Sequence, residues 1–86
     1  MTREQYDGYN RKVLCALAAV NCYQCFYSAL HYAQAEEAID DARSYALFVT
    51  GDAMSDEVKI TLHLRDTLTA AKRQHEEAER FADAAR

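Results

Sequence analysis

The chain contains no proline and only two glycines in 86 residues, so few positions force a helix to end. Ala, Leu, Glu, Gln and Arg, which favour helices, dominate most of its length. A sandwich or barrel of short strands would need many more turn residues. Hydrophobic residues make up 50% of the chain, which excludes a disordered tail. We therefore expect an all-α fold in a single domain covering residues 1–86.

Residues that favour helix ends occur at a few places. Thr2 and Gln5 have the spacing of a capping box, and Asn10 is an alternative first cap. Gly51 is the residue type that follows a helix end, and Ser55 precedes two acids as at a helix start. The predicted elements are a helix over about 10–50, a turn over 51–54 and a helix over about 55–84. Because the turn is short, we expect a long antiparallel helical hairpin.

The first predicted helix changes its apolar face partway along. Its earlier apolar residues are Ala16, Ala19, Val20, Tyr23, Phe26, Tyr27 and Leu30. Its later ones are Ala35, Ala38, Ile39, Ala42, Tyr45, Ala46 and Val49, which lie more than about 100° away on a helical wheel. Either the helix breaks near 32–36 and the chain has three helices, or it continues and its halves bury different faces. Since no Pro, Gly or Asn marks a break there, we favour a continuous helix.

The segment from Val13 to Ala33 carries no formal charge when His is neutral. A segment that is apolar nearly all round is normally buried on several sides, and one further helix cannot cover it. Small chains often complete such a core by pairing, so we expect an intertwined homodimer. Six residues are Tyr, a type common at protein interfaces. The predicted dimer or partner interface consists of Val20, Tyr23, Phe26, Tyr27 and Leu30.

Three cysteines, Cys15, Cys22 and Cys25, suggest a metal or redox sensor as one interpretation. A structural zinc site needs four convergent ligands, and the sequence offers no second close pair. We therefore favour the other interpretation, in which these cysteines are small buried hydrophobes. Accordingly, we predict no metal and no cofactor.

Catalytic patterns are also missing from the sequence. The histidines, His31, His63 and His75, are dispersed and form no recognisable motif with a nucleophile. No glycine-rich turn offers a cradle for phosphate or an oxyanion. We predict no catalytic residues and no enzymatic activity.

Four acids, Glu36, Glu37, Asp40 and Asp41, lie within six residues of the first predicted helix. They are either a docking patch for a basic partner or a solvated helix face. The formal net charge is −4, and without a strongly basic balance we do not expect nucleic-acid binding.

The segment from Met1 to Asp7 has no apolar core typical of a signal peptide. Together with an odd number of cysteines, this favours a reducing cytoplasm. The uncharged segment from Val13 to Ala33 is long enough to span a membrane. Its polar side chains, among them Asn21 and Gln24, argue against such a span.

These observations predict a non-enzymatic protein–protein interaction module. In size, acidity and helix content the chain resembles small helical inhibitors made by phages and mobile elements, which implies an inhibitor or adaptor that binds a larger protein. The alternatives are a cysteine-based metal or redox sensor and a structural subunit that completes a helical assembly.

Overall fold

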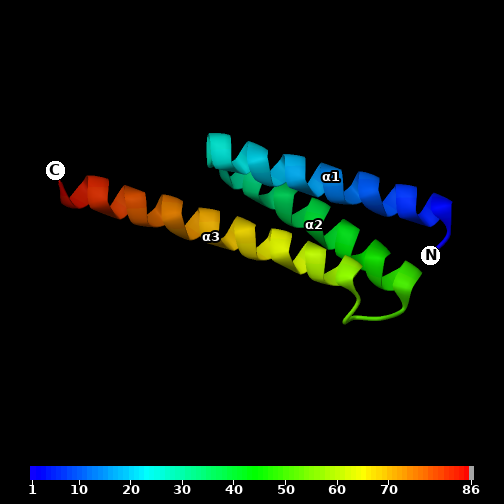
Figure 1. Cartoon of the computed structure of the whole chain (residues 1–86). Coiled ribbons are helices and arrows are strands. Elements are labelled where there is room, and N and C mark those ends of the chain that lie inside the picture. Colours follow the sequence, from blue (N-terminus) through cyan, green and yellow to red (C-terminus); the bar gives the residue numbers. More distant parts are fainter. Residues whose placement is uncertain (86) are drawn as a thin grey trace.

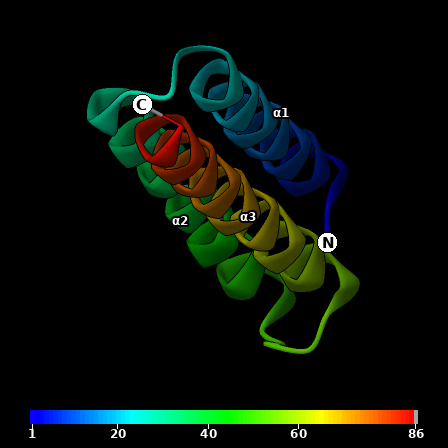
Figure 2. The same ribbon diagram turned by 90° about the vertical axis from the view of Figure 1, so that its left-hand side faces the viewer.

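The computed structural model describes residues 1–85, which form three α-helices and no strand. The helices are α1 (Arg3–Phe26), α2 (Ala29–Thr50) and α3 (Asp56–Ala84). Each helix runs antiparallel to the one before it (Figure 1). The second view shows α2 beside both other helices, and α1 also contacts α3 (Figure 2). The all-α prediction is confirmed, and the molecule is an elongated bundle with extents of 56 × 21 × 13 Å.

The first helix starts earlier than the predicted residue 10. The Thr2 hydroxyl accepts a hydrogen bond from the Gln5 backbone N–H at 3.2 Å, and the Gln5 side chain accepts from the Thr2 N–H at 2.9 Å. This capping box satisfies two free backbone donors, so α1 begins at Arg3. Gly8 lies inside α1, where a Cβ atom would come within 2.8 Å of the Tyr45 hydroxyl oxygen. Glycine at this position therefore lets Tyr45 of α2 approach α1 closely.

The continuous helix that we favoured over about 10–50 is wrong, because the chain turns at Tyr27 and Ser28. Tyr27 adopts the left-handed conformation at φ 48°, and its N–H donates to the Tyr23 carbonyl at 2.7 Å. Ser28 then caps α2 by accepting from the His31 N–H at 3.1 Å. The break thus precedes the predicted position at 32–36.

Within residues 1–85, no helix combines the length and the apolar character needed to cross a membrane.

The turn resets the helix axis, which explains why the apolar face changes direction along the sequence. Each helix buries one stripe in the bundle. The buried residues are Tyr9, Ala16, Val20 and Tyr23 of α1, Ala35, Ile39, Ala42 and Ala46 of α2, and Val58, Thr61, Leu64, Leu68 and Ala71 of α3. Small residues dominate the α2 stripe, so the neighbouring helices can pack closely against it.

The connection from α2 to α3 is stabilised by local hydrogen bonds. Gly51 adopts φ 63°, and its N–H donates to the Leu47 carbonyl at 2.8 Å. Asp52 accepts from the Met54 N–H at 2.9 Å, and Ser55 caps α3 by accepting from the Val58 N–H at 3.3 Å. These bonds satisfy backbone groups that helix ends leave free.

The third helix is longer than its two neighbours and extends past the turn between α1 and α2 (Figure 1). From Glu76 to Ala85 every residue is exposed. The apolar spacing of α3 continues through Ala78 and Ala82, but no other helix of residues 1–85 covers that stretch.

The hydroxyl of Ser28 is the cap that begins α2, so its removal tests the turn. We expect Ser28→Ala to lower the free energy of unfolding by about 1 kcal/mol, the usual effect of losing an N-cap. Ser44→Ala, at an exposed position within the same helix, is the matched control and should not destabilise the protein. Urea unfolding followed by far-UV circular dichroism measures both variants. Equal unfolding midpoints for the two variants would contradict the capping role.

Candidate protein-binding surface

The structure separates the five residues of the predicted interface. Val20 and Tyr23 are only 1% and 3% exposed, because they pack in the core between the three helices. These two residues are therefore covered by their own chain and are not open to a partner. Phe26 and Leu30, in contrast, are 68% and 65% exposed, and the exposed fraction of Tyr27 is intermediate at 37%.

An aromatic cluster surrounds the turn between α1 and α2. The Tyr23 ring lies edge-on to Tyr27 and to Tyr32, with 5.3 Å between ring centroids in each pair. Tyr27 stacks on His75 of α3 at 4.3 Å, and the His75 Nε2 atom lies 3.0 Å from the Glu79 carboxylate. These rings border a hollow of about 260 Å³. The stacking joins the strained turn to α3, so we assign this cluster a supporting role in the fold.

Burial changes the acidity of three tyrosines. Desolvation raises the pKa of Tyr9, Tyr23 and Tyr32 above the usual 10.0. Nearby acids add to the effect, since Glu57 lies near Tyr9, Glu76 near Tyr23 and Glu36 near Tyr32. All three hydroxyls are thereby stabilised in the neutral form.

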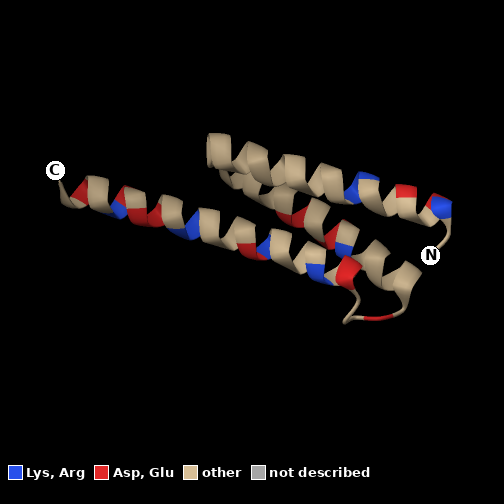
Figure 3. Cartoon of the chain, viewed as in Figure 1, with Lys and Arg blue, Asp and Glu red and all other residues tan. Residues whose placement is uncertain are grey.

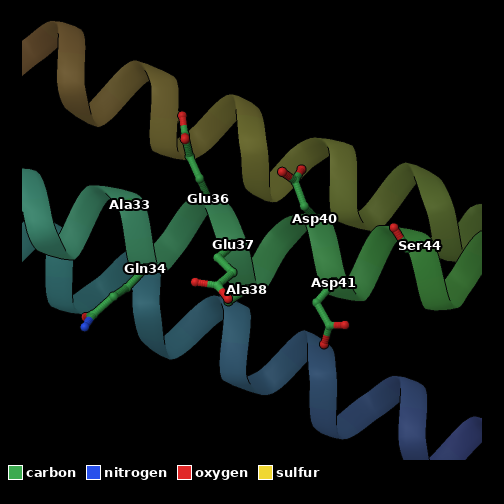
Figure 4. A pocket seen from close by; sticks show the side chains of 8 residues that line it. All are labelled: Ala33, Gln34, Glu36, Glu37, Ala38, Asp40, Asp41 and Ser44. Atoms are coloured by element: carbon green, nitrogen blue, oxygen red, sulfur yellow. The ribbon is translucent and has the colours of Figure 1, made fainter.

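The predicted acidic patch lies on the outer side of α2, and all four of its carboxylates are exposed. Figure 4 shows Glu36 and Asp40 directed toward α3, whereas Glu37 and Asp41 are directed toward α1. Asp41 pairs with Lys12 of α1 at 2.7 Å, and Asp40 lies 3.8 Å from Arg65 of α3.

The hollow drawn in Figure 4 is lined by residues of α2 alone, so it is the outer face of one helix and not a cleft between helices. Two of the four acids already have a cation within the chain. The arrangement therefore matches a solvated helix face that also attaches α2 to its neighbours.

The cysteines are placed differently from our expectation of small buried hydrophobes. Cys15, Cys22 and Cys25 are free thiols and all three are exposed on α1. Within residues 1–85, no group of three or more His, Cys, Asp or Glu side chains is arranged to hold a metal ion. The thiols instead belong to a larger surface on the outside of α1.

We name this surface the α1 outer face. It comprises Leu14, Cys15, Leu17, Ala18, Asn21, Cys22, Gln24, Cys25 and Phe26, all of them exposed. None carries a formal charge, and Figure 3 shows α1 without Lys, Arg, Asp or Glu beyond its N-terminal part. Leu14 is 63% exposed, and the face lies opposite the buried stripe that contains Ala16 and Val20. The sequence did not single out this face, although the uncharged segment from Val13 to Ala33 was the signal for it.

Comparisons with protein-family models, with curated proteins and with solved structures find no match to this chain.

The raised pKa values predict how stability depends on pH. The unfolded chain ionises its tyrosines near pH 10.0, before the folded chain does, so the folded state binds more protons above that pH. The stabilisation from the neutral hydroxyls is fully present below pH 10.0. It is lost as the pH rises through the raised pKa values that these tyrosines have in the folded state. We expect the urea midpoint to fall over that range, with tyrosinate absorbance rising as the protein unfolds.

The control replaces Tyr9, Tyr23 and Tyr32 by Phe in one protein. Phenylalanine keeps the rings but cannot ionise, so the fall in the midpoint above pH 10 should become shallower. A fall that is equally steep in this variant would show that other groups cause the alkaline unfolding.

Proposed function

We propose that this chain is a non-enzymatic protein–protein interaction module and that the α1 outer face is its binding surface. The observation that carries the proposal is the exposure of leucine, phenylalanine and cysteine side chains on a helix face without charge. Contiguous exposed apolar patches on small proteins are typical of contact sites.

The outer sides of the other two helices differ from the α1 outer face. The α2 outer side carries four acids, and the exposed part of α3 bears interspersed acids and bases (Figure 3). Burying such charges against a partner is costly unless each finds an opposite charge. The α1 outer face carries no such desolvation penalty, so it is the surface best suited to form a dry contact.

The partner that we propose for this face is a second copy of the chain. An uncharged surface brought against itself by a two-fold axis creates no like-charge repulsion across its centre. Pairing also supplies the additional cover that a chain of this size often needs for its apolar residues. The proposed homodimer therefore forms through the outside of α1, whereas Val20 and Tyr23 stay in the core of each copy.

That the chain acts as an inhibitor or adaptor and binds a larger protein stays a prediction from the sequence. So does the cysteine sensor, although the exposure of all three thiols makes them available to solution reagents in a single copy.

A charge on the α1 outer face tests the proposal. At tens of micromolar we expect light scattering to give twice the 9.8 kDa of one chain, and Leu14→Glu to give 9.8 kDa. In a dimer of the variant, each copy would bury one carboxylate. Each buried carboxylate should raise the dissociation constant of the dimer about tenfold, so the two together should raise it about a hundredfold. Circular dichroism should show an unchanged helix content, since Leu14 is exposed in a single copy.

Phe48→Glu is the control, because Phe48 is an apolar residue of α2 that is 81% exposed and lies outside the α1 outer face. This variant should remain a dimer. The proposal fails if the unaltered chain has a mass of 9.8 kDa throughout, or if Phe48→Glu dissociates the dimer while Leu14→Glu does not.

A further inference from the structure

We infer that two copies pair through antiparallel α1 helices, with Leu14 of one copy against the partner's Cys25 and Ala18 against the partner's Asn21. This inference rests on the proposed function, since it specifies how the α1 outer face meets its counterpart. The two-fold axis lies between the two α1 helices, at a level midway between Ala19 and Val20.

The spacing of the exposed residues defines the seam. Leu14, Ala18, Asn21 and Cys25 follow one another at intervals of four, three and four residues. This is the spacing of the central positions in a coiled coil, and it places all four on one side of α1. All four are exposed and lie opposite the stripe that α1 buries in its own bundle. A second helix can therefore lie along them without displacing α2 or α3.

The sizes of these residues suit a close approach of the two helices. Antiparallel pairing in this register sets the large Leu14 beside the smaller Cys25 at both ends of the seam. At its centre it sets the small Ala18 beside Asn21. In each layer the larger residue thus faces a smaller one, which is how helices interdigitate.

Charge complementarity favours the antiparallel direction over the parallel one. The last turn of α1 contains no basic residue, so no cation of its own helix faces the negative end of its dipole. In the antiparallel register, residues of the two copies whose numbers add to 39 lie at the same level along the pair. The partner's Arg11 therefore lies level with Ser28, just beyond this end of α1. A parallel pair would set the two Arg11 side chains at the same level and bring neither of them to the end of a partner helix.

The polar residue of the seam also has a partner in this arrangement. The two Asn21 residues lie three positions apart in level, which is about 4.5 Å along the axis. At that separation the amide side chains can hydrogen-bond to each other across the two-fold axis. A polar residue satisfied only in one register specifies that register.

The three thiols beside and within the seam provide a direct test. In the antiparallel register Cys15 and the partner's Cys22 flank the seam on the same side and differ by only about 3 Å in level. Two Cys15 residues differ by nine positions, or about 13 Å, and two Cys25 residues by about 16 Å. Two Cys22 residues differ by five positions, or about 7.5 Å. A short bismaleimide with a span of about 8 Å therefore reaches from Cys15 to the partner's Cys22 and between two Cys22 residues, but not between two Cys15 or two Cys25 residues. Each of its rings adds one thiolate and then a proton from water across its carbon–carbon double bond, and the masses of the linked peptides distinguish the Cys15–Cys22 product from the Cys22–Cys22 product.

The experiment uses three full-length variants that each keep one cysteine, with the other two replaced by Ala at their exposed positions. Proteins that keep only Cys15 and only Cys22 are mixed, left to exchange subunits, and treated with the reagent. We expect the mixture to give covalent dimer linking Cys15 to Cys22 at about ten times the yield of the Cys15-only or the Cys25-only protein alone. Adding Leu14→Glu to both proteins of the mixture should abolish the product.

The outcomes separate this inference from the proposed function. Efficient linkage of the Cys15-only protein to itself would show a parallel pair and overturn the register, while the α1 outer face would remain the contact. Absence of linkage in a mixture that light scattering shows to be dimeric would also overturn the register. A mass of 9.8 kDa for the unaltered chain would overturn both claims.

Discussion

The left-handed turn at Tyr27, followed by the Ser28 cap, is the constraint on which the rest of the structure depends. A bulky residue in this conformation is less stable by about 1–2 kcal/mol than in a helix, so other contacts must offset the difference. The Ser28 hydroxyl satisfies the first turn of α2, and the Tyr27 ring stacks on His75 of α3. Without the turn, α1 and α2 would be one rod and the core shared by three helices could not form.

The turn also decides which apolar residues remain outside. It folds the uncharged segment back on itself, so that α2 and α3 cover Ala16, Val20 and Tyr23. A helix packed into such a bundle still has a side turned away from it, and on α1 that side holds Leu14 and Ala18 without a charge. The exposed face is therefore a direct consequence of the same sequence segment that builds the core.

The helical class and most core positions could be predicted, because helix-breaking residues are scarce and the stripes of α2 and α3 repeat regularly. The turn could not, since Tyr27 is a residue type that rarely adopts positive φ and a serine occurs in many places besides caps. The change of apolar face near 32–36 indicated a discontinuity but placed it too late. Exposure of the cysteines was missed for a related reason: in a segment that is apolar nearly all round, periodicity does not tell which side faces the core.

Together, the turn and the charge distribution make α1 a helix with one buried and one available side. The central claim is that its outer face is open in a single copy and covered in a pair, and thiol reactivity measures this most directly. The rate of alkylation of Cys25, which lies within the seam, should approach that of free cysteine at nanomolar protein. It should fall severalfold at tens of micromolar, where the face is covered. Rates that stay constant over that whole range would contradict the account.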